Sequence, residues 1–160
     1  EFPLKIMLAR APTLSEPMIN SYLKNSRAKI EIVSDKTYEL LSAGDLGLIG
    51  SGTATLESAL AGLPMIILAR THWLNYFLAK PFVHTKFYGL PNLIADRKIA
   101  PELVMREVNS HRIYIELKKL ILSSGLREEM RFQLLKIREL LGTKKASEEA
   151  GKAIMELLEG

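Results

Sequence analysis

Two glycines and several hydroxyl side chains lie between an apolar run and a helical pattern in the stretch LGLIGSGTATLESALAGLP, which begins at Leu46. Gly50 and Gly52 lack side chains and can adopt dihedral angles closed to other residues, so backbone amides can approach a ligand closely there. A helix that begins at Thr53 adds unpaired N–H groups and a partial positive charge. The stretch therefore predicts a site for a phosphate group.

Polar side chains near this turn extend the predicted site. The hydroxyls of Ser51, Thr53 and Thr55 add donors, and Glu57 follows Thr53 by one helical turn, where a carboxylate could accept hydrogen bonds from a ribose diol. The alternative is purely structural, because tight strand-to-helix turns favour Gly and Ser, and Glu57 would then only interact with the helix dipole. The turn alone leaves both interpretations open.

Better-known catalytic and phosphate-binding loops do not fit the stretch. Thr53 stands where the Walker loop needs lysine, and Thr55 stands where the dinucleotide-binding pattern needs its third glycine. Ile49 stands where a nucleophile elbow around Ser51 would need glycine. Hydrolase chemistry at Ser51 is therefore disfavoured.

A second polar group lies in LPNLIADRKIAPE, residues 90–102. We expect a loop here between a strand and a helix, on the same edge of the sheet as the glycine turn. Arg97 could pair with phosphate oxygens, and Asn92 could orient a sugar or a base. The alternative is an ordinary turn in which Asp96 and Arg97 are solvated charges.

The segment THWLNYFLAKPFVHTKFY, residues 71–88, contains the only tryptophan and is apolar over more than one helical stripe. One interpretation is a helix buried between the sheet and the helices that follow. The other is an interfacial helix that contacts a membrane or acyl chains through Trp73, Tyr76, Phe77 and Lys80.

The composition excludes several other classes of site. The chain has no cysteine among its 160 residues, which rules out disulfides and thiolate metal sites and favours a reducing compartment such as the cytoplasm. His72, His84 and His111 lack the spacing of a zinc site, so we expect no metal. The net charge of +4 is spread along the chain, which weakly favours an anionic partner such as a phosphate, a lipid head group or nucleic acid. Basic and acidic residues alternate on the tail helices, which is typical of a solvated helix face and not of a nucleic-acid surface. No apolar run reaches the roughly 20 residues that cross a bilayer, and the first residues lack a signal-peptide pattern.

The elements that must position these residues follow from the apolar spacing. We expect strands at 5–9, 29–33, 46–50, 65–69 and 86–90, and helices at 15–25, 35–43, 53–61 and 72–80, the third of them ended by Gly62 and Pro64. This alternation predicts an α/β fold with a doubly wound, Rossmann-like parallel sheet. Beyond Pro101 the spacing is only helical, at 101–108, 110–123, 126–141 and 147–158.

The chain therefore divides into an α/β region at 1–100 and a helical tail at 101–160, which packs on that region or on a partner domain. In an open parallel sheet, ligands bind where strands end and the next helices begin. The glycine turn at 50–52 is such a place.

Three stretches of the sequence together resemble a known family. SGTATLESALAGLPMII (51–67), LAK (78–80) and LPNLIADR (90–97), in this order and spacing, resemble the C-terminal half of the lipid-A-disaccharide synthases. These are bacterial glycosyltransferases of the two-Rossmann B type, and the similarity covers nearly the whole chain.

The resemblance implies an enzyme of lipid A biosynthesis that transfers 2,3-diacylglucosamine from UDP to 2,3-diacylglucosamine 1-phosphate. It implies inversion at the anomeric carbon, no tightly bound metal or other cofactor, and peripheral association with the cytoplasmic face of the inner membrane. It also makes residues 1–100 a nucleotide-sugar-binding region. On this basis the diphosphate would be held by Ser51, Gly52 and Thr53, the ribose by Glu57, and the nucleotide-sugar side of the cleft by Asn92 and Arg97.

The sequence departs from the family pattern in two respects. Glycine is usual where Asp96 stands, and a negative charge there would weaken a phosphate contact of Arg97 or redirect its side chain. The family's acceptor-binding N-terminal domain, and the opening strand and glycine-serine-arginine loop of the donor domain, are not in this sequence. The general base is expected in that missing half, so no residue here is assigned as catalytic. We expect the chain alone to bind nucleotide weakly and to transfer nothing.

Two other functions stay open at this point. One is another UDP-sugar transferase, or an epimerase, of the same fold. The other is a non-catalytic module in which residues 71–88 and the tail bind a membrane or a partner protein. The sequence also leaves open the acyl-chain specificity and whether the protein is a homodimer.

Overall fold

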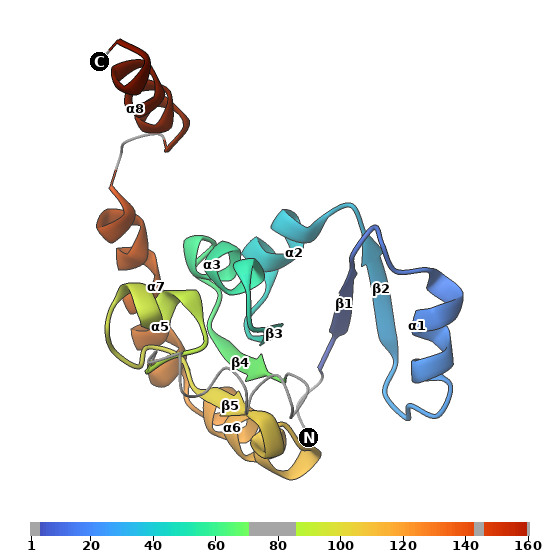
Figure 1. Cartoon of the computed structure of the whole chain (residues 1–160). Coiled ribbons are helices and arrows are strands. Elements are labelled where there is room, and N and C mark those ends of the chain that lie inside the picture. The colour runs from blue at the N-terminus through green and yellow to red at the C-terminus, as the bar shows by residue number, and fades with distance from the viewer. Residues whose placement is uncertain (1–3, 71–85, 143–145, 160) are drawn as a thin grey trace.

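The structure is a computed structural model of the chain, and it describes residues 4–70, 86–142 and 146–159. Strands and helices alternate along these residues before a helical C-terminal part (Figure 1). In chain order the elements are β1 (Ile6–Arg10), α1 (Glu16–Leu23), β2 (Ile30–Ser34), α2 (Thr37–Ala43), β3 (Gly47–Gly50), α3 (Thr53–Leu60), β4 (Met65–Ala69), α5 (Leu90–Ile94), β5 (Glu102–Val104), the 3-10 turn η1 (Met105–Glu107), α6 (Ser110–Leu122), α7 (Ser124–Leu141) and α8 (Ala146–Glu159).

All strand pairs of the described residues are parallel, in two sheets. β1 pairs with β2, and β4 lies between β3 and β5 in the second sheet. Gly47 lies opposite Met65, and Ile67 lies opposite Glu102. Helices connect β1 to β2, β2 to β3 and β3 to β4, as a parallel arrangement requires. The predicted Rossmann-like α/β class is confirmed.

The core of the molecule is centred on β4. Met65, Ile66 and Ile67 are completely buried because β4 has a strand on each side and helices against its faces. Helix α7 packs along α3, and α6 contacts β4, with α3 and α6 on opposite sides of this strand in Figure 1. The tail helices α6 and α7 therefore complete the same core as the sheet, chiefly through Leu120, Met130, Leu134 and Ile137.

The β1–β2 pair is much less covered than β4. No residue of either strand is buried, and the apolar side chains of Ile6 and Leu8 are 39% and 36% exposed. Helix α2 contacts β1, β2 and α3, and so joins this pair to the rest of the molecule. Since a parallel sheet is normally buried on both faces, the pair contributes little to the core.

Two of the predicted elements that fall within the described residues are wrong, and the helix expected at 72–80 lies outside those residues. The strand expected at 86–90 is absent, because residues 86–89 form a turn that leads into α5. The helix expected at 101–108 is replaced by β5 and η1. Pairing of β5 with β4 overrides the helical spacing of this stretch, as tertiary contacts often override local propensity.

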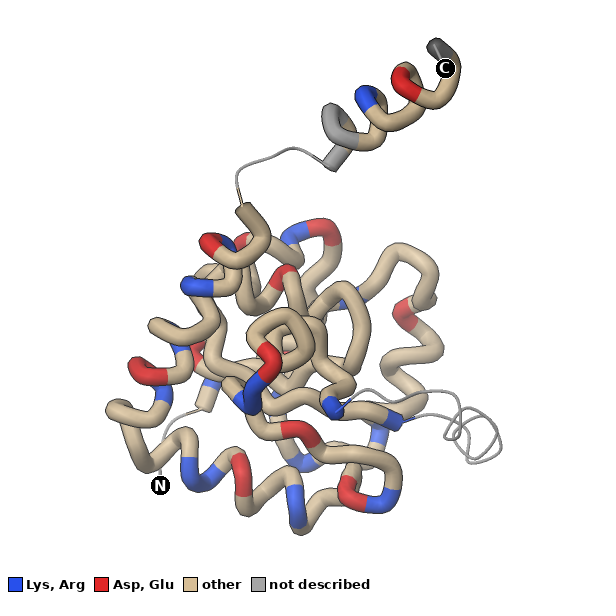
Figure 2. The backbone as a smooth tube through the Cα atoms, turned by 60° about the vertical axis from the view of Figure 1, so that its left-hand side comes forward, with Lys and Arg blue, Asp and Glu red and all other residues tan. Residues whose placement is uncertain are grey.

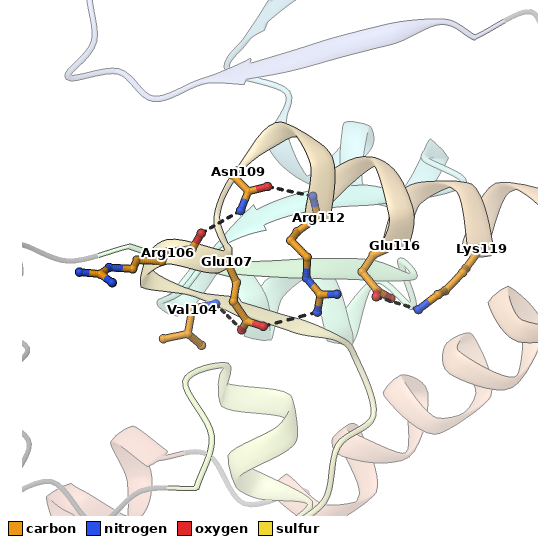
Figure 3. Close-up of polar contacts among 7 residues, drawn as sticks. All are labelled: Val104, Arg106, Glu107, Asn109, Arg112, Glu116 and Lys119. Atoms are coloured by element: carbon orange, nitrogen blue, oxygen red, sulfur yellow. Dashed lines mark hydrogen bonds and ion pairs between the residues drawn. The ribbon is translucent and has the colours of Figure 1, made fainter.

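The passage from the sheet to the tail is held by the polar contacts drawn in Figure 3. Asn109 caps α6, since its Oδ1 accepts from the Arg112 amide at 3.0 Å while its Nδ2 donates to the Arg106 carbonyl at 2.8 Å. The Glu107 carboxylate accepts from the Val104 amide at 3.4 Å and lies 3.4 Å from the Arg112 guanidinium. These contacts tie β5, η1 and α6 into one unit.

Helix α8 stands apart from the other described elements (Figure 1). Its apolar side chains include Leu157 and Leu158, which are 83% and 75% exposed. A helix with an apolar stripe usually buries it against another element, and within the described residues this stripe has no such cover.

Charged residues of both signs are interspersed along the described chain, as Figure 2 shows. This agrees with the absence of a basic block in the sequence. None of the helices that the structure describes is both long and apolar enough to cross a membrane.

Candidate functional site

The glycine turn lies at the carboxyl end of β3, where the sequence predicts it. The Ser51 amide donates to the Leu68 carbonyl at 2.9 Å and so continues the pairing of β3 with β4. Gly52 then adopts φ 139° and ψ −162°, and α3 begins at Thr53. These dihedral angles are in a region that is essentially restricted to glycine, so the turn requires glycine at this position.

The turn is open to solvent. Gly50, Ser51, Gly52 and Thr53 are all exposed, and so is Glu57 one helical turn later. Among the described residues, no side chain caps the start of α3. Because the first amides of a helix have no intrahelical acceptor, those of Thr53 and Ala54 remain available to an anion, whereas the Thr55 amide donates to the Gly52 carbonyl. The arrangement offers backbone donors, hydroxyl groups and a carboxylate on one accessible surface.

Thr55 differs from its predicted role. Its side chain is completely buried, and its hydroxyl donates to the Gly52 carbonyl at 2.6 Å. The same oxygen accepts from the Leu90 amide at 3.2 Å. The expectation that Thr55 adds a donor for a ligand is therefore wrong, because the protein already uses its hydroxyl hydrogen.

Asn92 lies in α5 and is completely buried. Its Nδ2 donates to the Ala100 carbonyl and to Glu102 Oε1, both at 2.8 Å. Its Oδ1 accepts from the Ile99 and Ala100 amides at 2.7 and 2.9 Å. The amide is thus fully engaged in joining α5 to β5. Its contact with a nucleotide sugar stays a prediction.

Sequence reasoning missed Glu102, which holds the start of α5. Its carboxylate oxygens accept from the Tyr88 amide at 2.8 Å and from the Gly89 amide at 2.9 Å, in addition to the contact with Asn92. No sequence signal identifies this role, because the apolar spacing indicated a helix at 101–108 and hid the strand that carries Glu102.

The segment around Arg97 lies elsewhere than expected. The loop after α5 leads into the amino end of β5, whereas the glycine turn follows the carboxyl end of β3. Because the strands of this sheet are parallel, the loop and the turn lie at opposite ends of the strands. The expectation that residues 90–102 share an edge with the turn therefore holds only for the start of α5, where Leu90 meets Thr55.

Asp96 and Arg97 have separate partners. The Arg97 guanidinium donates to Gln133 of α7, and Asp96 lies 3.7 Å from Lys86. A shallow hollow of about 430 Å³ between this loop and helices α6 and α7 is lined partly by Arg97, but by neither the turn nor Glu57. The structure thus brings Ser51, Gly52, Thr53 and Glu57 together and does not bring Arg97 to them. Its phosphate contact stays a prediction.

Asp96 has a positive φ of 47°, a conformation that glycine adopts more readily than other residues. Asp96 follows Ala95, the C-cap of α5, and the Asp96 and Arg97 amides donate to the Leu93 and Asn92 carbonyls. Such a helix end needs a left-handed residue, which is usually glycine and occasionally Asn or Asp.

Trp73, Tyr76, Phe77 and Lys80, the predicted membrane or acyl-chain contacts, lie outside the described residues. The described part of the chain contains no group of three or more His, Cys, Asp or Glu side chains that could hold a metal ion.

Comparison with known proteins assigns the family. A family model described as lipid-A-disaccharide synthetase matches residues 3–156 of the chain. The chain belongs to the lipid-A-disaccharide synthase family. The position of the glycine turn at the carboxyl edge of a parallel sheet agrees with the resemblance found in the sequence.

Several curated relatives carry the name lipid-A-disaccharide synthase. The one from Nitrosococcus oceani is 30% identical over 139 residues, which cover 87% of this chain and 36% of the relative. The Myxococcus xanthus protein is 30% identical over 97% of this chain and 40% of its own length, and an Anaeromyxobacter dehalogenans protein is 34% identical over 82% and 35%. The chain therefore spans about two fifths of the length of these relatives.

Proposed function

We propose that the chain is the donor-binding part of a glycosyltransferase that makes the lipid A disaccharide. The full enzyme would transfer 2,3-diacylglucosamine from UDP to 2,3-diacylglucosamine 1-phosphate and invert the anomeric carbon. Membership of the family supports this activity. The observation that carries the site is the exposed, uncapped start of α3 behind a turn that only glycine can form.

Each group of this site has a part in the proposed reaction. The Ser51 and Thr53 hydroxyls and the Gly52 and Thr53 amides would bind the diphosphate, since the Ser51 amide already pairs with β4. Glu57 would accept hydrogen bonds from the ribose. When the bond to the sugar breaks, negative charge builds up on the leaving UDP. Amides that are already fixed stabilise this charge without reorganising, which is the usual source of electrostatic catalysis. No metal or other cofactor is needed in this scheme.

The proposed enzyme needs parts beyond this chain. The general base and the acceptor-binding domain would belong to the rest of the longer protein, so the chain alone would not transfer sugar. We also propose that α8 packs against the rest of the longer protein. The exposed side chains of Leu157 and Leu158 support this proposal.

The opening strand of the donor domain would lie between β1 and β3. In the described residues, β1 pairs only with β2 and β3 pairs only with β4, so each has an unpaired edge. The Gly47 and Ser51 amides donate to the β4 side, to the Pro64 and Leu68 carbonyls. Since successive amides of a strand point in opposite directions, the Leu48 amide points away from β4, towards the unpaired side of β3. One added parallel strand would join the two sheets and cover Leu48, which is 46% exposed.

We propose peripheral association with the cytoplasmic face of the inner membrane through Trp73, Tyr76, Phe77 and Lys80. The support is the aromatic and basic composition of residues 71–88 together with the acylated substrates of the reaction. Flotation with anionic liposomes at low salt tests this part separately. Failure to float would remove it and leave the nucleotide site unaffected.

Calorimetry of the chain with UDP, UDP-N-acetylglucosamine and UDP-2,3-diacylglucosamine tests the proposed function. We expect all three to bind weakly, the acylated donor most tightly, and Glu57→Gln to weaken binding by about tenfold, as for a lost hydrogen bond to a charged group. Glu39→Gln, another exposed carboxylate near a helix start, is the matched control.

Three results would change the proposal. Equal affinity for donors with and without acyl chains would favour another UDP-sugar enzyme of this fold. An unchanged affinity in Arg97→Ala would remove Arg97 from the site. No binding of any nucleotide, with the protein folded, would contradict the donor site itself.

A further inference from the structure

The shape of the glycine turn is not held by the turn residue itself. Gly52 has no side chain, and the position that a Cβ would occupy has no neighbour within 4 Å. Glycine reaches many other backbone conformations at little cost. Contacts from outside must therefore keep φ at 139°, which makes the residues that supply them important for any ligand of the turn.

Thr55 supplies such a contact from the first turn of α3. Its hydroxyl donates to the Gly52 carbonyl at 2.6 Å, while the Thr55 amide donates to the same carbonyl at 3.1 Å. The hydroxyl oxygen also accepts from the Leu90 amide at 3.2 Å. One buried side chain thus links the peptide after Gly52 to the start of α5.

The far end of this link is itself fixed. The Glu102 carboxylate accepts from the amides of Tyr88 and Gly89, the two residues directly before Leu90. It also accepts from the side-chain amide of Asn92, two residues after Leu90. β5, which carries Glu102, pairs with the buried strand β4. The Leu90 amide is therefore a donor of fixed position, and the Thr55 hydroxyl connects the exposed turn to the core.

We propose that Thr55 is a positioning residue of the nucleotide site. Its hydroxyl fixes the Gly52 peptide, and thereby the direction of the amides that face a diphosphate. The inference rests on the proposed function, because it assigns Thr55 a part in the same site. It requires no contact between Thr55 and the nucleotide, which its complete burial would prevent.

Ser58 provides a matched control on the same helix. It is also completely buried, and its hydroxyl donates to the Ala54 carbonyl at 2.7 Å. This is a contact within α3 that touches neither the turn nor α5. Ser58→Ala therefore removes a buried hydroxyl from α3 without disturbing the link.

The test compares Thr55→Val, Thr55→Ser and Ser58→Ala with the unchanged chain. Calorimetry measures the affinity for UDP, and nuclear magnetic resonance measures the Gly52 and Thr53 amide shifts without ligand. We expect Thr55→Val to weaken UDP binding about five- to tenfold, as for one lost hydrogen bond, and to shift both amides. Thr55→Ser, which keeps the hydroxyl, and Ser58→Ala should remain within about twofold.

The two readouts separate the inference from the function on which it rests. If Thr55→Val and Ser58→Ala give the same affinity and the same Gly52 and Thr53 shifts, Thr55 does not position the turn. If the unchanged chain binds no UDP, the proposed function fails. In that case the Gly52 and Thr53 amide shifts still decide whether Thr55 holds the turn. A loss of fold in Thr55→Val is recognised by comparing its amide spectrum with that of Thr55→Ser.

Discussion

At the scale of single residues, Gly50 and Gly52 differ in one property that decides their tolerance of substitution. Both are exposed, and an added Cβ would meet no atom within 4 Å at either position. Only Gly52 has a positive φ, 139°. The cost of a side chain at Gly52 is therefore conformational and not steric crowding by neighbours.

We accordingly expect Gly52→Ala to lower the free energy of unfolding by about 1 to 3 kcal/mol, the usual cost of a residue forced into this region. Gly50→Ala should change it by less than about 0.5 kcal/mol. Urea denaturation of both variants provides the measurement. Equal stability of the two variants would mean that the turn relaxes to another conformation, and the proposed fixed amides would then be doubtful.

Residue types at the turn could be predicted from sequence, but their partners could not. The pattern around Gly52 and Glu57 identified the exposed turn because glycine and the start of a helix leave local signals. The role of Thr55 could not be predicted, because it depends on Leu90, a residue 35 positions later. The local spacing suggested that the Thr55 hydroxyl is free for a ligand. In the fold, this hydroxyl donates to the Gly52 carbonyl and accepts from the Leu90 amide.

At the scale of elements, the junction of α5 and β5 depends on one buried amide. Asn92 makes four hydrogen bonds to Ile99, Ala100 and Glu102. We expect Asn92→Ala to lower the free energy of unfolding by about 2 to 4 kcal/mol, because it leaves several buried polar groups without partners.

A suitable comparison for Asn92→Ala is Asn109→Ala in the same denaturation experiment. Asn109 also bonds backbone groups on both sides, but it is an exposed cap at the start of α6, so its loss should cost only about 1 kcal/mol. If the two variants lower the free energy of unfolding equally, the stability of the α5–β5 junction does not depend on the buried Asn92 amide.

The elements themselves were predictable to the extent that their patterns are local. Strands β1 to β4 and the long helices α6 and α7 follow apolar spacing and lie close to their expected ranges. β5 has three residues, too few to show the alternation of a strand, and it exists because β4 offers an edge to pair with. Short elements of this kind are set by tertiary contacts and not by their own sequence.

At the scale of the whole molecule, burial is distributed unevenly. Every residue of β4 from Met65 to Ile67 is completely buried, whereas β1 and β2 contain no buried residue. Two parallel strands with open faces are marginal without further packing. The sequence suggested one continuous sheet because apolar runs indicate strands but carry no information on which strands are neighbours.

Native-state hydrogen exchange measures this difference directly. We expect amides of β1 and β2 to exchange through local opening, with free energies at least about 2 kcal/mol below those of β4, because regions with few buried contacts open before the global transition. In a longer chain of the family that carries the proposed strand between β1 and β3, protection at Leu8 and Leu48 should rise towards the value for Ile67. Equal protection of β1 and β4 in this chain would show that the β1–β2 pair needs no further strand. Unchanged protection in the longer chain would mean that the two sheets stay separate.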